Sequence, residues 1–203
     1  MHYDFIEIGT ADFHTEIEKA NPNTRGLSVE PVLYYLNKLP PKPLVHKVLA
    51  AISDQDGWAD CYYLPESMID KHFPGQWELK GNNAINTYHP QALHHVQAAG
   101  LNPEEIFAHV RVPKFSFQTL ADMYQVTSLD LLKTDTEGHD CIILRSVINC
   151  IQANKIQIEQ IKFESNVLSN AGEVDSVIMS LQKLGYKLLS RGEDTILKNF
   201  TCK

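Results

Sequence analysis

Apolar residues fall into short runs separated by amphipathic stretches, and this alternation predicts strands and helices in turn along the chain. Most of the runs contain few polar residues, as expected for strands that are buried on both faces of a parallel sheet. Each run ends in glycine, proline or polar residues, which are typical of turns. The predicted strands are residues 3–8, 26–30, 45–52, 130–134, 157–164, 186–190 and 195–199.

The stretches between these runs have apolar residues at helical spacing. The clearest case is residues 173–184, which Gly185 follows in the position of a C-terminal cap. The last two strands surround residues 191–194 and form a predicted hairpin with glycine in its turn. Alternating strands and helices indicate an α/β fold. The predicted helices are residues 12–20, 33–39, 116–124, 139–149 and 173–184.

The stretch between the third and fourth predicted strands is much longer than one crossover helix requires. We therefore predict an insertion at residues 55–115, within a single domain that covers residues 1–203, and we expect the insertion to form a substrate pocket or lid. The insertion contains a predicted strand at 57–64, a polar segment at 75–88, a helix at 90–99 and a strand at 110–112.

Aromatic residues of the insertion form either the wall of a substrate pocket or a second small core, and the sequence leaves both alternatives open. They are Trp58, Tyr62, Tyr63, Phe73, Trp77 and Tyr88. The adjacent His94 and His95 do not indicate a metal site, because neighbouring helical side chains point about 100° apart. We predict no metal.

The composition of the chain limits the classes of molecule that the protein is expected to bind. The 25 acidic residues outnumber the 18 Lys and Arg residues, and the chain has no basic run, which argues against general nucleic-acid binding. No apolar run approaches the roughly 20 residues of a membrane helix, and the N-terminus lacks the basic region of a signal peptide. Four widely spaced cysteines indicate neither zinc nor disulfides. We expect a cytoplasmic protein that acts on a small molecule or a protein.

The segment 131–138 combines an apolar strand with Asp135, Glu137 and Gly138 at its end. Open α/β sheets bind ligands beyond the carboxyl ends of their strands, which favours a ligand site here. Alternatively, the two acids only stabilise the positive end of the following helix dipole. The segment by itself does not decide between these interpretations.

Glu30 ends the second predicted strand, 21 positions after Gly9. A unit of strand, turn, helix and strand brings an acid at this distance to the ribose hydroxyls of a nucleotide-like cofactor. The alternative interpretation is a solvated glutamate at a strand end.

Several strand-end motifs occur in a characteristic order. They are Ile6-Glu7-Ile8-Gly9, Val29-Glu30-Pro31, Ala51-Ile52-Ser53-Asp54-Gln55-Asp56-Gly57, Leu132-Lys133-Thr134-Asp135-Thr136-Glu137-Gly138 and Ile161-Lys162-Phe163-Glu164. From about residue 3 to residue 199, the chain resembles the FkbM-type family of class I S-adenosylmethionine-dependent methyltransferases. The resemblance implies a Rossmann-like sheet of seven mostly parallel strands, in which the C-terminal hairpin contributes an antiparallel strand.

The resemblance also implies a cofactor, a reaction and a set of roles. A methyl group of S-adenosylmethionine would pass to a hydroxyl oxygen of a small molecule or glycan. Glu7 and Gly9 would approach the methionine part, and Glu30 would bind the ribose. Ser53 and Asp54 would flank the adenine, and Asp135 would lie near the sulfonium and the acceptor.

Methyl transfer to a hydroxyl group requires positioning and the removal of one proton. Asp135 is the first candidate for the base, because its strand end should face the methyl group. Glu137, His139 and Glu164 are further candidates, and Lys133 could orient the acceptor or a carboxylate.

Two other functions are alternatives to methyl transfer. Asp12 stands where the family usually has a small or amide residue, which motivates a catalytically reduced S-adenosylmethionine-binding or scaffold protein as the alternative. A nicotinamide-dependent oxidoreductase is disfavoured, because the glycine pattern that approaches a pyrophosphate is missing.

Overall fold

The structure is a computed structural model that describes residues 1–11 and 14–201 of the chain. Its larger sheet has seven strands in the order β10-β11-β9-β8-β1-β2-β3. All neighbouring pairs are parallel except the two that include β11. The predicted α/β fold with a mixed, mostly parallel sheet is confirmed. The strands are β1 (His2–Ile8), β2 (Gly26–Glu30), β3 (Val45–Leu49), β8 (Ser128–Thr134), β9 (Gln157–Glu164), β10 (Lys187–Ser190) and β11 (Asp194–Lys198).

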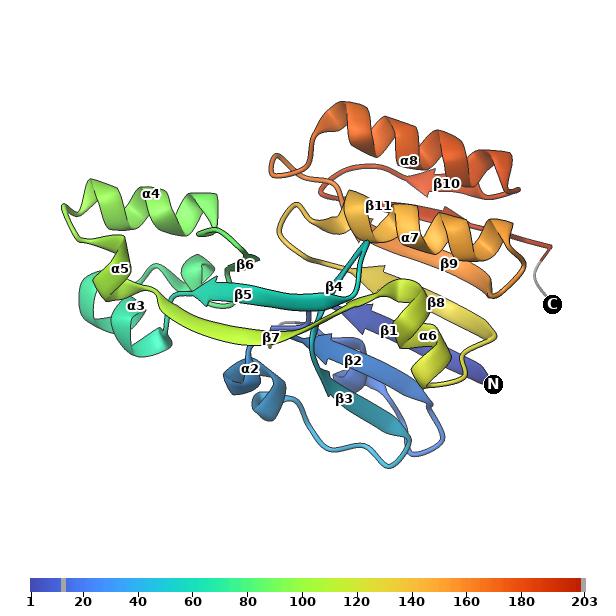
Figure 1. Cartoon of the computed structure of the whole chain (residues 1–203), viewed down its shortest axis with the longest axis horizontal. Helices are drawn as coiled ribbons and strands as arrows, with labels where there is room; N and C mark the ends of the chain where they lie inside the picture. Colours follow the sequence, from blue (N-terminus) through green and yellow to red (C-terminus); the bar gives the residue numbers. More distant parts are fainter. Residues whose placement is uncertain (12–13, 202–203) are drawn as a thin grey trace.

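Helices pack on both faces of this sheet (Figure 1). On one face, Ile6 and Leu132 pack with apolar residues of α6, α7 and α8. On the other face, Phe5 packs with Ile17 of α1 and Leu36 of α2. The neighbours Phe5 and Ile6 thus point to opposite faces, as they must in a strand that is buried on both sides. The helices are α1 (Glu16–Lys19), α2 (Leu33–Lys38), α6 (Phe117–Met123), α7 (Asp140–Gln152) and α8 (Ala171–Lys183).

The ends of α8 follow from local hydrogen bonding. At its start, the Asn170 side chain accepts hydrogen bonds from the backbone N–H groups of Gly172 and Glu173. At its end, Gly185 adopts a φ of +92°, and its N–H donates to the Gln182 carbonyl at 3.0 Å. The predicted glycine cap is confirmed. None of the helices in the described part of the chain has the length and hydropathy needed to cross a bilayer.

The prediction of one strand at residues 45–52 is wrong. Strand β3 ends at Leu49, and after Ala50 the chain continues as β4 (Ala51–Ser53), which pairs with β7 (Ala108–Ser116) of a second sheet. An apolar run indicates that its residues are buried. It does not indicate that the chain changes its partner strand in the middle of the run. The first predicted helix, residues 12–20, is also shorter in the structure, and its residues 12–13 lie outside the described part.

The second sheet has the strand order β4-β7-β5-β6. Strand β5 (Gly57–Tyr63) is antiparallel to both β7 and β6 (Asn83–Ile85). Strands β5 and β7 lie side by side and form an extension that connects the larger sheet with a group of helices (Figure 1). We call residues 57–116, from the start of β5 to the end of β7, the arm. Its other elements are α3 (Glu66–His72), the 3-10 helix η1 (Trp77–Leu79), α4 (Pro90–Ala98) and α5 (Pro103–Ile106).

The arm has its own hydrophobic core. Phe73, Leu79, Val96 and Phe107 are buried there with further apolar residues, and Tyr62 and Tyr88 pack against them. Trp58 and Trp77, in contrast, are 61% and 70% exposed. Tyr62, Phe73 and Tyr88 therefore contribute to a second small core, which was one of the two alternatives that the sequence left open.

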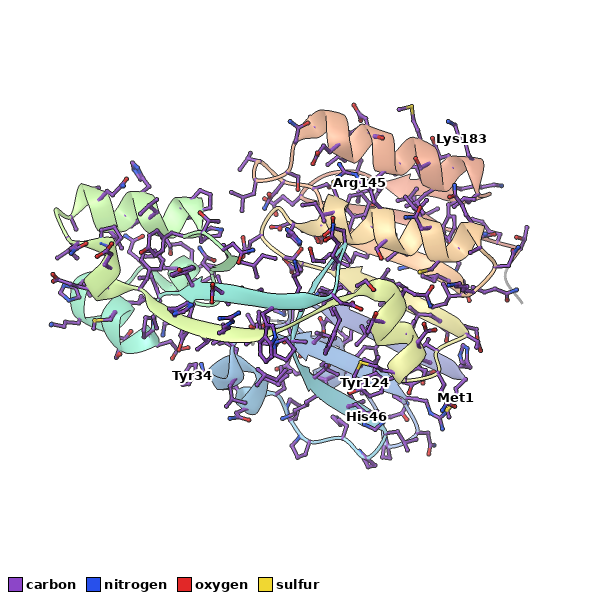
Figure 2. The ribbon with its side chains drawn as sticks, viewed as in Figure 1. Met1, Tyr34, His46, Tyr124, Arg145 and Lys183 are labelled. Atoms are coloured by element: carbon purple, nitrogen blue, oxygen red, sulfur yellow. The ribbon has the colours of Figure 1, made fainter. Side chains whose placement is uncertain are left out.

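We call the described residues outside the arm the larger unit. Surface side chains connect its neighbouring elements (Figure 2). Arg145 on α7 forms an ion pair with Glu173 on α8, with 2.8 Å between Nη2 and Oε1. The rings of His46 on β3 and Tyr124 after α6 lie 5.3 Å apart between centroids. Because Arg145 and Glu173 are each about half exposed, we expect their pair to add little to stability.

The turns after β1 and β8 are in direct backbone contact. Gly9 has a φ of +78°, and its N–H donates to the Val29 carbonyl at 3.0 Å, while the Asp135 N–H donates to the Ile8 carbonyl at 2.9 Å. A Cβ atom on Gly9 would lie 2.0 Å from the carbonyl oxygen of Asp135. Gly9 is therefore required both for its backbone conformation and for its lack of a side chain.

We expect Gly9→Ala to lower the free energy of unfolding by more than about 3 kcal/mol, because strain at positive φ adds to a clash between two backbones. The control is Gly75→Ala, since Gly75 has a φ of +87° but no atom within 4 Å of the added Cβ. Its cost should be limited to about 1–2 kcal/mol. Urea denaturation measures both, and equal losses would contradict the argument from close packing.

Candidate active site at the carboxyl ends of the central strands

A cleft lies beyond the carboxyl ends of β1, β2 and β8, with the arm on one side. From the larger unit it is lined by residues 8–11, 29–31, 50–52 and 135–137 together with His139. From the arm it is lined by Lys80, Gly81 and residues 83–85. This edge is where open α/β sheets bind their ligands.

Glu30 lies at the floor of the cleft and is fully buried. Its Oε2 atom accepts hydrogen bonds from the backbone N–H groups of Thr10 at 3.2 Å and Ala11 at 2.9 Å. Its Oε1 atom accepts one from the Val32 N–H at 2.9 Å. The carboxylate thus orders the turn after β1 from the end of β2, in addition to facing the cleft.

The turn after β1 also contributes a buried hydroxyl group to the lining of the cleft. Thr10 is 3% exposed and lines the cleft. Its Oγ1 atom has no hydrogen-bond partner among the residues that the structure describes. Because a buried hydroxyl without a partner is costly, this atom is a candidate contact for a polar ligand.

Glu7 and Lys133 form a buried ion pair outside the lining of the cleft. The Lys133 Nζ lies 2.8 Å from Glu7 Oε1, and Glu7 Oε2 accepts from the Glu16 N–H at 2.9 Å. Burial raises the pKa of Glu7, and the lysine charge opposes this shift. Burial also acts to lower the pKa of Lys133, but the Glu7 carboxylate outweighs it and the pKa is raised. Lys133 therefore stays charged and bound to Glu7.

Asp135 lines the cleft directly after β8. Burial raises the pKa of its carboxyl group, the nearby Lys133 charge lowers it, and the Glu137 charge raises it. Among the three predicted catalytic residues, Asp135, Lys133 and Glu164, it is the one that lines the cleft.

Glu164 lies behind the turn that follows β8. It is 8% exposed, and its Oε2 atom accepts from the Gly138 N–H at 3.3 Å. Burial, together with the charges of Glu137, Asp140 and Asp135, raises the pKa of Glu164 to about 8. A carboxyl group that is largely protonated at neutral pH and lies outside the cleft lining is a poor base.

Ser53 and Asp54 do not line the cleft, but they contact a residue that does. The Ser53 hydroxyl donates to Asp54 Oδ1 at 3.1 Å and lies 3.0 Å from His139 Nε2. Burial lowers the pKa of His139, the Asp54 charge opposes this, and the Lys114 charge adds to it. At neutral pH we therefore expect a neutral His139 imidazole.

In the described part of the chain, the carboxylates that line the cleft are not among the residues grouped closely enough to hold a metal ion. Among the described residues, one group has ligand atoms within 4.8 Å of one another, and it consists of His2, Asp4 and Asp130. These residues lie on β1 and β8 toward the amino ends of the strands, at the edge of the sheet opposite the cleft.

The Methyltransferase FkbM domain family matches residues 7–188 of the 203-residue chain. The chain belongs to this family. No significant match was found among curated proteins or among solved structures.

Within this FkbM domain, the structure brings Gly9, Glu30 and Asp135 together at the cleft. The other residues that were predicted for the site have different surroundings. Glu7 and Lys133 pair with each other, Ser53 and Asp54 lie behind His139, and Glu164 lies behind the turn after β8. Asp12 lies outside the described residues. The roles suggested for these residues stay predictions.

Sequence reasoning predicted that the insertion forms a substrate pocket or lid, but it missed the residues through which the arm lines the cleft. Lys80, Gly81 and Asn83 line it, although they come from a segment that the sequence marks only as polar. The Gly81 N–H donates to the Tyr35 hydroxyl of α2 at 3.0 Å, which fixes this segment against the larger unit. The spacing of Gly81 and Tyr35 along the chain gives no signal for such a contact.

The raised pKa of Glu164 makes the stability of the FkbM domain depend on pH. Because the folded protein holds this proton more tightly than the unfolded chain, the stabilisation is complete below the unfolded pKa of about 4.5 and is lost as the pH rises through about 8. We expect Glu164→Gln to remove this loss and to be about 1–3 kcal/mol more stable than the wild type at about pH 9.

Chemical denaturation at about pH 5 and about pH 9 measures this difference. Asp140, whose pKa burial raises to about 6, titrates in both proteins, so the difference between them reports Glu164 together with its coupling to Asp140. A wild type and a variant with parallel pH dependences would show that Glu164 is charged in the folded protein.

Proposed function

We propose that this FkbM domain is an S-adenosylmethionine-dependent methyltransferase whose acceptor is a hydroxyl group of a small molecule or glycan. The observation that carries the proposal is the meeting of the Gly9 turn and the buried Glu30 carboxylate at one cleft beyond the parallel strands. This is the arrangement that a strand, turn, helix and strand unit provides for a nucleotide-like cofactor.

Three residues fit this cofactor. Gly9 lines the cleft without a side chain, so only backbone atoms stand between its turn and a ligand. Glu30 presents a buried carboxylate of the type that accepts from ribose hydroxyls. The Thr10 hydroxyl, which has no partner among the described residues, is suited to bind the polar end of the methionine part.

Bound S-adenosylmethionine supplies a methyl group that is activated by a positively charged sulfur. Asp135 lines the cleft beside the Gly9 turn, and we assign its carboxylate to binding this positive charge. Because the positive charge on sulfur fades as the methyl group leaves, such a contact strengthens binding of the cofactor more than it accelerates the reaction. Asp135 is thus proposed as a binding residue.

The arm is proposed to form one wall of the acceptor site. Its residues 80–85 face the turn after β8 across the cleft, with Lys80, Gly81 and residues 83–85 in the lining. Enclosing the methyl group between two units excludes water from the reaction and fixes the direction of attack.

Calorimetric titration with S-adenosylmethionine and S-adenosylhomocysteine tests the proposal. We expect both to bind to the wild type, and Glu30→Ala to bind each about 10–100-fold more weakly, because charge-assisted hydrogen bonds worth about 1.5–3 kcal/mol are lost. Glu30→Gln keeps the side-chain volume and should lose less. Glu159→Ala removes a carboxylate that pairs with Lys198 on β11, and it should bind like the wild type.

The outcomes separate the hypotheses. If the wild type gives no heat of binding with either compound, the proposed function is wrong. Wild-type affinity in a folded Glu30→Ala protein would show that the ribose assignment is wrong. Tight binding without methyl transfer to any of a broad panel of hydroxyl compounds would favour a cofactor-binding or scaffold protein.

A further inference from the structure

The turn after β8 has an unusual residue in a demanding position. Glu137 and Gly138 have φ values of +54° and +91°, and the His139 N–H donates to the Thr136 carbonyl at 3.2 Å. Two consecutive residues with positive φ inside a four-residue turn define the type I′ geometry, for which Gly, Asn and Asp are favoured. Glutamate is disfavoured at this position, so its presence calls for a role of the side chain.

Contacts on three sides prevent the turn from relaxing. Asp140 Oδ2 accepts from both the N–H and the hydroxyl of Thr136, at 3.2 and 2.9 Å. Glu164 Oε2 accepts from the Gly138 N–H. A Cβ atom on Gly138 would lie 2.8 Å from the Leu168 carbonyl oxygen. The backbone of Glu137 is thereby fixed between its neighbours.

A histidine of the arm fixes the side chain of Glu137. His89 is 1% exposed and is the N-cap residue of α4, where its Nδ1 accepts from the Ala92 N–H at 3.4 Å. An imidazole that accepts at Nδ1 carries its proton on Nε2. Nε2 therefore donates to Glu137 Oε2, at 3.0 Å. The hydrogen bond that Nδ1 accepts from the first turn of α4 thus determines the tautomer of His89.

The second oxygen of Glu137 is left for a ligand. Glu137 lines the cleft, and its side chain is 25% exposed. Glu137 Oε2 accepts the hydrogen bond from His89. Glu137 Oε1 accepts no hydrogen bond from residues 1–11 or 14–201. The carboxylate is thus held by the arm through one oxygen, in a residue that lines the cleft together with Asp135.

We propose that Glu137 accepts the proton of the acceptor hydroxyl and that His89 positions it for this step, an inference that rests on the proposed methyl transfer. The acceptor oxygen forms a bond to the methyl carbon, and the carbon–sulfur bond breaks with its electron pair on sulfur. The hydroxyl proton passes to Glu137 Oε1 and is later released to water. The arm thus contributes a positioning residue as well as a wall.

Other candidates for the base are engaged elsewhere. Lys133 is charged and paired with Glu7, and Glu164 contacts the backbone of the turn from outside the cleft lining. His139 Nε2 lies against Ser53, and Asp135 is assigned to the positive charge of the cofactor. Because Asp135 and Glu137 both face the cleft, we expect a neutral hydroxyl compound and not an anion as acceptor.

The test compares the wild type with Glu137→Gln, His89→Asn and the double variant. The amide introduced by Glu137→Gln would still accept from His89 but would not take a proton. The asparagine introduced by His89→Asn would still cap α4 but would not reach position 137. Methyl transfer is measured with radiolabelled S-adenosylmethionine and a panel of methyl glycosides and glycerol. S-adenosylhomocysteine binding is measured by calorimetry.

We expect Glu137→Gln to lower the rate of transfer at saturating acceptor by about 100-fold or more, with binding of S-adenosylhomocysteine within about twofold of the wild type. His89→Asn should lower the rate by about 10-fold with little change in melting temperature. The double variant should match Glu137→Gln, since His89 acts through Glu137. His94→Asn, a change at an exposed position of the same helix, is the control and should match the wild type.

The tautomer provides a readout that requires neither cofactor nor acceptor. Nitrogen-15 NMR of the ligand-free protein should show His89 with its proton on Nε2, and a proton on Nδ1 alone would overturn the positioning role. Equal transfer by the wild type and Glu137→Gln, including no transfer by either, would overturn the base assignment. Failure of the wild type to bind S-adenosylhomocysteine would instead reject the proposed function.

Discussion

The contact between the turns after β1 and β8 is the constraint on which the site depends. Gly9 packs on the Asp135 carbonyl, and the Glu30 carboxylate accepts from the N–H groups of Thr10 and Ala11. Three neighbouring strands therefore end at one rigid floor. Because backbone groups form most of this floor, its shape depends on the fold more than on individual side chains.

Burial periodicity made most of the larger unit predictable. The strand at residues 26–30 is confirmed at both ends, because a run of buried residues between two turns leaves one interpretation. The Gly185 cap is confirmed as well, since a local backbone requirement leaves a local signature. For the site, Gly9, Glu30 and Asp135 were predictable because strand ends of a parallel sheet meet at one edge.

Features that depend on contacts distant in sequence were not predictable. An apolar run across Ala50 looks the same whether or not the chain changes sheets there. The ion pair of Glu7 and Lys133 joins residues on neighbouring strands, so each looked like a functional polar residue when taken alone. The contact of His89 with Glu137 joins the arm to the larger unit. Neither the types of these two residues nor their spacing along the chain predicts it.

The separate core of the arm has a consequence for how this protein can change over evolutionary time. The apolar residues that stabilise the arm, such as Phe73 and Val96, belong to a different cluster from those beneath the cleft floor. Substitutions in one cluster are largely additive with substitutions in the other. The arm can therefore be remodelled, exchanged or extended while the floor stays intact, so that one wall of the cleft can change without loss of the turns that form its base.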